Sequence, residues 1–542
     1  MTLDEKRANR PALPKRAVVT GGMPYGNKNL HFGHVGGCLI HADAMTRFLR
    51  DRLGRENVLF VSGTDCYGSP ITEDYRKKAA SGEFCGSLTD FVRFNHENQK
   101  ATLDAYGISP DLFGASALGR PAEIHREMSR WVLETLHENG HLRKLSSEQF
   151  FDPERGVFLN GRQVLGRCPV EGCQSEKGYA DECDLGHQYL PGELIAPKSA
   201  LTGATPELRE SPNFYIRADE MRPLLKEWLG EFATRDRARP FVVSSIAEFL
   251  EPPVIYVKRE LTGDLSALTL PPYEVRDEGK PSVALVFTSL DEREKAVAAL
   301  SVAGIRFRTG KTLVPFRLTG NAEWGVSAPD IDGLGGLTFW VWPESLWAPI
   351  SFTKAALEER GGDWRDWWCS PDAKVIQFIG QDNVYFYGPA QAALFLGLQG
   401  KNPVLPPPDG SLPMTDVVAN NHILFFNKKA SSSGKLKPPM ADEVLKYYTP
   451  EQLRAHFLGL GLSIRSVGFQ PKPLNPDAKE GDQDPVLKEG SLFTNVLNRA
   501  ARSCFYTAQK YTGGKLPDTP VSPGTLEKCE ETILDFELLM SR

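Results

Sequence analysis

The sequence predicts an α/β fold in which helices flank a parallel sheet and a helical region follows at the C-terminal end. Three observations lead to this prediction. A strand, a glycine-rich loop, a helix and a second strand follow one another between residues 17 and 68. Another buried strand, at 375–379, is also followed by a glycine turn. Between these segments, cysteines and a histidine have the spacing of metal ligands. Together they indicate a Rossmann-type parallel sheet with a zinc-bearing insertion.

The first unit is organised around His31-Phe32-Gly33-His34. A β-branched run that begins at Ala17 reads as a strand, and a breaker-rich loop separates it from a helix expected to begin near His34. Apolar residues at spacings of three and four continue to Leu53. By themselves, the two histidines could be surface residues. Their place at a helix N-terminus, where free N–H groups and the helix dipole attract anions, instead suggests phosphate binding.

Two flanking segments carry a resemblance to a known family. Met23-Pro24-Tyr25-Gly26-Asn27 precedes the histidines, and Gly63-Thr64-Asp65-Cys66-Tyr67-Gly68 ends the second strand. Together they resemble the first half of the catalytic domain of class I aminoacyl-tRNA synthetases, most closely the methionyl-tRNA synthetases.

This resemblance implies a role for each matching residue. His31, Gly33 and His34 are the expected catalytic residues, which would hold the ATP phosphates. Asn27, in the loop before them, is expected to bind ATP. The expected amino-acid site is Asp65, which would bind the ammonium group, together with Met23 and Tyr25.

Composition places the chain among ordinary soluble proteins, with 41% hydrophobic and 24% charged residues. Its 542 residues are enough for three to four domains. No apolar run reaches the roughly 18 to 20 residues that cross a bilayer, so we expect no membrane association and a cytoplasmic location. The net charge of -6 gives no general attraction to nucleic acid, so any RNA contact would need local basic patches.

A metal site is predicted in the insertion. Cys168, Cys173, Cys183 and His187 form two close pairs, and glycines and a proline supply the turns between them. Thiolates and an imidazole in such pairs can surround Zn²⁺ tetrahedrally. Because no open ligand position is evident, we expect structural zinc rather than catalytic zinc.

The second half of the expected catalytic domain also resembles the family. Trp342 follows a strand-like run, and Gly380 and Asp382 end the strand at 375–379, where a carboxylate can hold ribose hydroxyls. The resemblance implies that Gly380 and Asp382 bind ATP and that Trp342 and Tyr387 line the amino-acid pocket.

Several positions of this pocket depart from the family. Glu344 replaces an aspartate, Tyr387 a histidine and Gln391 an aromatic residue, while Trp347 lies in a changed segment. An unpaired Gln391 amide in a dry cavity would cost roughly 1 to 3 kcal/mol, which puts specificity for methionine in question.

A lysine- and serine-rich segment stands where the family has its K-M-S-K-S loop. The resemblance assigns catalytic roles to Lys429 and Ser432 and ATP contacts to Lys428 and Lys435. Ser432 replaces a lysine that would neutralise the departing pyrophosphate, so we expect activation to be slower by roughly 10²-fold. A flexible linker is the alternative interpretation of this segment.

The expected segments follow in a fixed order along the chain. They are the first half of the catalytic domain (16–114), an inserted connective domain with the zinc knuckle (115–240), a small α+β addition (241–318), the second half of the catalytic domain (319–418), the K-M-S-K-S-like loop with a stem-contact region (419–470) and a partial anticodon-binding-like helical region (486–542). The addition is either a structural embellishment or an extra substrate or RNA contact. Residues 1–15 are expected to form a loose lead.

Three functional hypotheses follow from the residues and the resemblance. The first is a divergent methionyl enzyme that uses ATP and Mg²⁺ to form an aminoacyl adenylate and passes the amino acid to tRNA, with Zn²⁺ as a structural metal. The second is a paralogue that adenylates another amino acid for tRNA or another acceptor. The third is a catalytically weakened binding protein that retains the fold.

Overall fold

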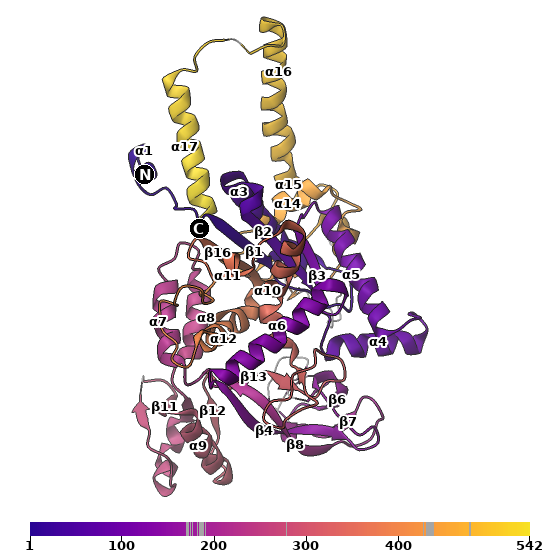
Figure 1. Ribbon diagram of the computed structural model, residues 1–542, viewed down its shortest axis with the longest axis vertical. Coiled ribbons are helices and arrows are strands. Elements are labelled where there is room, and N and C mark those ends of the chain that lie inside the picture. Colours follow the sequence, from indigo (N-terminus) through magenta and orange to yellow (C-terminus); the bar gives the residue numbers. More distant parts are fainter. Residues whose placement is uncertain are drawn as a thin grey trace.

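The computed structural model describes residues 1–542 except 170–172, 174, 176, 181, 182, 184–188, 190, 278, 426, 427, 430–437, 476, 477, 517 and 542; the side chains of 264, 428 and 429 are also not described. A five-stranded parallel sheet in the order β17-β16-β1-β2-β3 forms its centre (Figure 1). The strands are β1 (Arg16–Gly21), β2 (Val58–Thr64), β3 (Leu112–Ala115), β16 (Ala373–Gly380) and β17 (Asp416–Asn420).

Each central strand is buried on both faces, because alternate residues enter two different hydrophobic cores. Val18 of β1 packs in one core, and Val19 packs in the other. The first core is completed by α6 (Gly119–Glu138), α10 (Val341–Arg360) and α12 (Gln391–Gln399), and the second by α3 (Ile40–Leu53) and α14 (Pro450–Gly459). The near-continuous apolar runs of these strands follow from this double coverage.

The helix after the first strand begins earlier than the sequence indicated. It starts as α2 (Phe32–His34), passes through a π-helical turn at Val35–Leu39 and continues as α3. Gly36 in that turn lies against α14, where a Cβ would come 2.5 Å from the Phe457 ring. The side chain of His31 caps the helix by accepting a hydrogen bond from the Gly33 N–H.

Strand β1 lies between β2 and β16, which belong to the two halves of the sheet. The connections from β1 to its two neighbouring strands run on opposite sides of β1. The carboxyl ends of β1 and β16 therefore border a crevice of the kind in which open α/β sheets bind ligands. The remaining helices of the two halves are α4 (Ser69–Ser81), α5 (Leu88–Ala105) and α11 (Arg365–Trp368).

The connective region is built around two long antiparallel strands, β4 (Leu142–Asp152) and β8 (Glu207–Ile216). The other elements of this region are β5 (Val157–Phe158), β6 (Val164–Arg167), β7 (Ile195–Ser199), β13 (Phe316–Arg317), β14 (Thr319–Gly320), β15 (Thr338–Phe339), α7 (Arg222–Phe232) and α8 (Pro240–Leu250). We expected the insertion to begin at 115; helix α6 packs in the first core, which residues of β8, α7 and α8 share.

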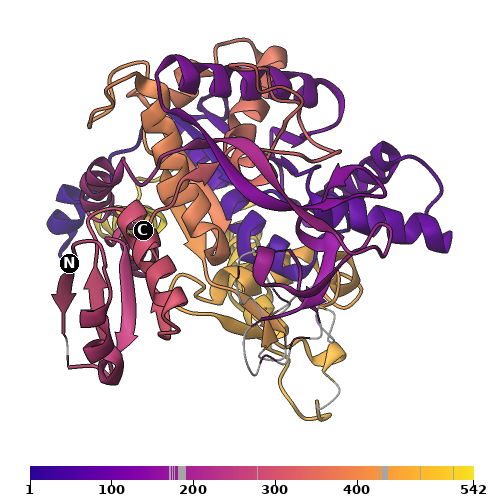
Figure 2. The same ribbon diagram turned by 90° about the horizontal axis from the view of Figure 1, so that it is seen from below.

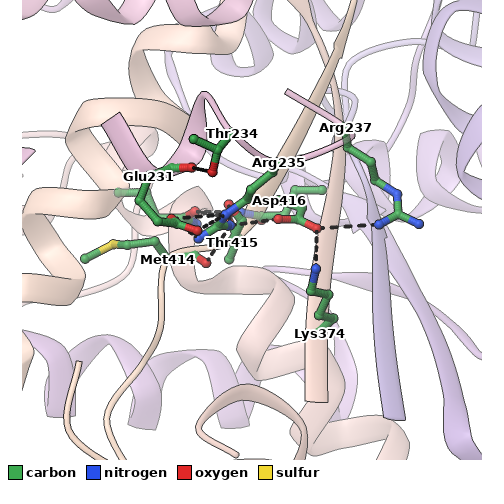
Figure 3. Close-up of polar contacts among 10 residues, drawn as sticks. Glu231, Thr234, Arg235, Arg237, Lys374, Met414, Thr415 and Asp416 are labelled. Carbon is green, nitrogen blue, oxygen red and sulfur yellow. Dashed lines mark hydrogen bonds and ion pairs between the residues drawn. The ribbon is translucent and has the colours of Figure 1, made fainter. Parts of the chain in front are cut away.

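A polar network joins the linker between α7 and α8 to the sheet (Figure 3). The carboxylate of Asp416, at the start of β17, accepts a hydrogen bond from Arg235 at 2.7 Å. Side-chain nitrogens of Arg237 and Lys374 lie 3.7 and 3.6 Å from the same carboxylate. Asp416 is nearly fully buried, so the cations compensate its charge in a poorly solvated place.

A small separate unit occupies residues 254–309, which is shorter than the expected 241–318. Its four antiparallel strands have the order β10-β11-β9-β12, and its own core does not include α8 or Leu313. The strands are β9 (Val254–Lys258), β10 (Glu274–Arg276), β11 (Ser282–Val286) and β12 (Phe307–Thr309), with a 3-10 segment at Arg259–Ala267 and helix α9 (Leu290–Val302).

The C-terminal elements contact both the sheet and the N-terminus. They are β18 (Ile423–Phe425), β19 (Lys428–Lys429), α13 (Ala441–Val444), α14, β20 (Val467–Phe469), α15 (Pro485–Leu492), a π turn at Phe493–Leu497, α16 (Asn498–Thr512) and α17 (Pro523–Met540). Helices α16 and α17 project from the body as separate rods (Figure 1).

The N-terminal residues are not the loose lead we expected. They form α1 (Leu3–Ala8), which lies beside α17 and is joined to it by ion pairs, including Lys6 to Glu531 at 3.0 Å and Arg10 to Glu537 at 2.7 Å. Among the described residues, no helix has both the length and the apolar character required to cross a membrane.

Candidate active site

A cavity of about 280 Å³ opens at the carboxyl ends of β1 and β16. Segments from both halves of the sheet line it. From the first half come Met23, Tyr25, His31, Gly33, His34 and Asp65, and from the second half come Trp342, Ser345, Gly380, Asp382, Tyr387 and residues 420–423. The structure thus brings together most of the residues that the sequence singled out, although the two groups come from distant parts of the chain.

Both histidines are neutral imidazoles held in one tautomer. Burial lowers the pKa of His31 to about 4 and that of His34 well below its usual value, and nearby Lys28 adds to both shifts. Nδ1 of His31 accepts from the Gly33 N–H at 3.0 Å, and Nδ1 of His34 faces the His31 N–H at 3.4 Å. A neutral ring whose Nδ1 accepts carries its proton on Nε2, so each Nε2 is a donor. The ring centroids lie 3.8 Å apart, which places the two donors side by side.

Asp65 is a buried carboxyl group at the end of β2. Its backbone N–H donates to the Pro24 carbonyl at 2.8 Å, and its own carbonyl accepts from Gly26 at 2.7 Å, so the loop after β1 holds it in place. Burial raises its pKa well above the usual range, and the Glu344 carboxyl raises it further. A bound cation such as an ammonium group would supply the compensating charge.

Glu344, which stands where the family usually has aspartate, is buried behind the cavity wall rather than lining it. One of its oxygens contacts His125 Nε2, and the other has no hydrogen-bond partner in the described part of the chain. Burial raises the pKa of Glu344 and lowers that of His125 to about 3, so burial favours the uncharged form of each group. His125 is held in turn by Ser351, 3.0 Å from its Nδ1.

One wall of the cavity is aromatic. The Trp342 ring stacks on Phe386 with centroids 4.1 Å apart and planes 3° from parallel, and Tyr25 meets Trp342 edge-on at 6.4 Å. Tyr387 lines the cavity from the same segment as Phe386. Such rings form an apolar, polarisable surface suited to a thioether or another apolar side chain.

The opposite edge carries groups suited to a nucleoside. At the turn after β16, a Cβ on Gly380 would lie 2.6 Å from the Asp382 carboxylate, so the close approach of this carboxylate to the backbone requires glycine. Asn420, Asn421 and His422 line the same region after β17. We did not single out these three residues from the sequence, although polar residues that directly follow a buried strand are a usable signal.

Gln391 does not enter the cavity, contrary to our expectation. Its Oε1 accepts from Gln377 at 2.6 Å and its Nε2 donates to the Leu346 carbonyl at 2.8 Å, in the buried space behind the wall. Trp347 is buried there too and donates to Ser129 at 2.8 Å. The presumed polar defect in the pocket is therefore a satisfied core interaction, because both hydrogen-bonding ends of the amide have partners.

Asn27 lies apart from the cavity lining. Its amide donates to Asp74 at 2.6 Å on helix α4, while its Oδ1 has no partner in the described part of the chain. The sequence assigned it to ATP binding, and it is not among the residues that line the cavity.

The K-M-S-K-S-like segment is described only at its two ends. Ser432 and Lys435 lie outside the described residues, and for Lys428 and Lys429 only the backbone of β19, paired with β18, is described. Strand β18 begins at Ile423, which lines the cavity, and Met440 on the other side pairs with His31 through a β-bridge. Both ends of the segment are therefore anchored beside the two histidines.

The predicted metal ligands are partly described. The sulfur atoms of Cys168, Cys173 and Cys183 all lie within 4.8 Å of one another, while His187 falls outside the described residues. Three thiol groups converging at this distance fit the donor set of a zinc site. The nearby pairing of β6 with β7 holds the chain on either side.

Comparison with known proteins agrees with this geometry. A family model described as "tRNA synthetases class I (M)" matches residues 17–261 and 299–472, well over half of the chain. The chain belongs to this family of class I tRNA synthetases. The resemblance to methionyl-tRNA synthetases is thereby confirmed, as is the α/β fold class.

Two relatives and one solved structure illustrate what this class I synthetase chain is similar to. A protein named methionine–tRNA ligase from Bacteroides fragilis (strain YCH46) is 26% identical to this chain, and the match covers 97% of this chain and 64% of the relative. A protein of the same name from Salinibacter ruber is 28% identical, and the match covers 94% of this chain and 59% of the relative. The chain thus spans about three fifths of their length. Mycobacterium tuberculosis methionyl-tRNA synthetase bound by methionyl-adenylate has the same fold, with a TM-score of 0.54, 16% identity and coverage of 97% of this chain and 82% of that one.

Proposed function

We propose that this chain uses ATP to convert an amino acid, with methionine as the expected substrate, to its aminoacyl adenylate and then transfers the amino acid to tRNA. The observation that carries the proposal is the composition of the cavity. Paired imidazole donors, a buried carboxyl group, an aromatic wall and a polar strand edge converge there from both halves of the sheet. The names of the relatives support the same activity.

In the first step, a carboxylate oxygen of the amino acid attacks the α-phosphate of ATP and pyrophosphate leaves. Nε2–H groups of His31 and His34 donate to phosphate oxygens as negative charge builds on them. Because these imidazoles are neutral at physiological pH, they act as fixed dipoles that need no proton transfer. ATP would bring Mg²⁺ bound to its own phosphate oxygens, which neutralises part of their charge.

Asp65 orients the amino acid by binding its ammonium group, and Asp382 holds the ribose hydroxyls at the edge of the sheet. Positioning both substrates in one cavity brings the carboxylate to the α-phosphate, and this supplies most of the rate in a reaction with little acid–base chemistry. In the second step, a ribose hydroxyl at the end of tRNA attacks the adenylate carbonyl and AMP leaves.

Methionine suits the aromatic wall for a physical reason. A thioether makes favourable contacts with ring edges, and Trp342, Tyr25 and Tyr387 offer such rings. The hydroxyl group of Ser345, which also lines the cavity, donates to the Trp342 carbonyl at 2.8 Å. The internal pairing of Gln391 removes the main reason for expecting a different amino acid.

Zinc has a structural role in this proposal. Cys168, Cys173 and Cys183 would hold it, with His187 as the expected fourth ligand. The metal would close the knuckle beyond β6 and β7 and take no part in the reaction.

Pyrophosphate exchange into ATP, measured with each standard amino acid in turn, tests the proposal. Exchange that depends on methionine supports it. Exchange that depends on another amino acid identifies the chain as a paralogue, and no exchange with any amino acid contradicts adenylation altogether. Charging of purified tRNA with the amino acid found by exchange then tests the second step.

A further inference from the structure

The small unit at 254–309 has the topology of a complete two-layer domain. Strand, helical segment, two strands, helix and strand follow in the order βαββαβ, and the antiparallel sheet order β10-β11-β9-β12 is that of a ferredoxin-like domain. It forms a lobe of its own beside the body (Figures 1 and 2). The family model leaves out residues 262–298, which make up the middle of this lobe.

Only one face of this sheet is covered. Ile255 and Val257 of β9 and Leu285 of β11 point into the lobe's core, where Leu300 of α9 packs with them. Residues at the alternating positions therefore point to the opposite face. That face lines an open groove of about 1050 Å³, bordered on its other side by α8.

One row of side chains crosses all four strands of the open face. The strand registers place Arg276 opposite Ala284, Ala284 opposite Tyr256, and Tyr256 opposite Arg308. The Arg308 guanidinium lies 4.5 Å from the centroid of the Tyr256 ring, a cation–π contact. The small side chain of Ala284 leaves space beside the ring. The half-buried ring of Tyr256 thus has Arg308 beside it on one side, and Arg276 lies beyond Ala284 on the other.

The charges around this row favour an anionic ligand. Lys258 and Lys280 are exposed at the same end of the sheet. Four cations, Arg276, Lys280, Arg308 and Lys311, line the groove together with two acidic residues, Glu248 and Glu251. Arg276 lies 3.9 Å from Glu274, Lys258 lies 3.5 Å from Glu260, and Lys311 pairs with Glu248 at 2.7 Å. The chain as a whole carries a net charge of -6, so a cationic face of this kind is a local feature.

We propose that this open face binds single-stranded RNA, with a base stacked on Tyr256 beside Arg308 and the adjoining phosphates held by Arg276 and the two lysines. Four-stranded antiparallel sheets bind single strands in this way, because aromatic side chains on the central strands stack with bases that have been released from a duplex. Tyr256 lies on β9, one of the two central strands. The open groove beside this face gives an extended strand with exposed bases room to lie along the row of side chains.

Fluorescence anisotropy with a labelled single-stranded RNA of about eight nucleotides tests the proposal on the full chain. The assay contains no ATP or amino acid, so it does not depend on the proposed ligase activity. We expect Tyr256→Leu to weaken binding by about tenfold, because base–aromatic stacking is lost while the apolar volume remains. Arg308→Gln should also weaken binding and reduce its dependence on salt.

Matched changes on the covered side of the sheet serve as controls. Tyr273 is a partly exposed ring whose centroid lies 6.0 Å from that of core residue Phe287, and Lys295 is an exposed cation on α9. Tyr273→Leu and Lys295→Gln should bind the RNA as the unchanged protein does. Thermal unfolding of every variant checks that the lobe remains folded.

Two results would overturn the proposal. One is an affinity for the RNA that is the same in the unchanged protein, Tyr256→Leu and Arg308→Gln. The other is no binding of the oligonucleotide at all. A photo-crosslink from a thiouridine-containing oligonucleotide to a β9 or β12 peptide would support it, and a crosslink confined to other parts of the chain would count against it.

Discussion

His31 and His34 act through their environment as much as through their chemical type. A surface histidine titrates near neutral pH, but these two are desolvated, so each remains a neutral Nε2–H donor across the physiological range. Asp65 is affected in the opposite direction, because burial favours the protonated form of a carboxyl group. Residue identity therefore names the candidates, and burial determines the form in which each of them works.

We expect His34→Ala to lower amino-acid-dependent pyrophosphate exchange by about 10²-fold or more, since a donor to the phosphates is lost. The fold should be unaffected, because within the described residues the only hydrogen bond of this ring is the long 3.4 Å contact with the His31 N–H. His137→Ala, at a half-exposed histidine on α6, is the matched control. Full exchange activity in His34→Ala would remove the proposed phosphate role.

Asp65→Asn should raise the KM for the amino acid by about tenfold or more and change kcat less, because a charge-assisted contact to the ammonium group is lost. The raised pKa of Asp65 also has a consequence for pH. Only the ionised carboxylate binds ammonium, so the KM of the unchanged protein should rise as pH falls toward that pKa. In Asp65→Asn this part of the pH dependence should disappear.

Steady-state exchange kinetics at several pH values measure both effects, with Asp366→Asn on the surface as the control. An unchanged KM in Asp65→Asn would show that the ammonium group binds elsewhere.

At the level of elements, short segments around the sheet set the geometry of the site. The loop after β1 is fixed by its backbone pairing with Asp65, and the K-M-S-K-S-like segment is anchored at both ends beside the histidines. The cysteine knuckle packs on a small hydrophobic cluster that includes Val164, Ala180 and Leu194. Its three described cysteines and the short β6–β7 pair add to this support.

Removal of zinc should therefore loosen the knuckle and leave the sheet intact. We expect Cys173→Ser, or treatment with a strong chelator, to abolish bound zinc and to raise amide hydrogen exchange in β6 and β7 by about tenfold or more. Cys85→Ser, at an exposed cysteine outside the cluster, should retain its zinc. Equal zinc content in the two variants would contradict the assignment of ligands.

To form the central sheet, the whole molecule must pair two halves that a long insertion separates in the sequence. Strands β1 and β16 pair in parallel register along six residues, although the connective region and the small lobe separate them in sequence. The network around Asp416 ties the end of the connective region to β16 and β17 (Figure 3). It lies at the amino ends of these strands, away from the cavity.

Asp416→Asn should lower the free energy of unfolding by about 3 kcal/mol, because buried cations would lose their counter-charge. Glu231→Gln is the matched control: this carboxylate contacts the same Arg235 but is largely exposed, so we expect a loss below about 1 kcal/mol. Urea unfolding measures both values. Similar losses in the two variants would show that burial of Asp416 has no special effect.

Local patterns were sufficient for much of this protein. The strand, loop and helix around the two histidines, the strand that ends at Gly380 and the amphipathic helix α6 follow from periodicity and breakers, because side-chain spacing reports which faces are buried. The candidate site residues that lie in motifs next to strand ends could also be identified from the sequence.

Long-range contacts decided the rest. Sequence spacing placed Gln391 in the pocket, but Gln377 and Leu346 hold it behind the wall. It also left residues 1–15 without structure, whereas acidic side chains on α17 order them. The open face of the small lobe became visible only when four strands were placed in register. Such features depend on partners that are distant in the chain, and hydrogen bonding and charge compensation with those partners leave no periodic signal in the sequence.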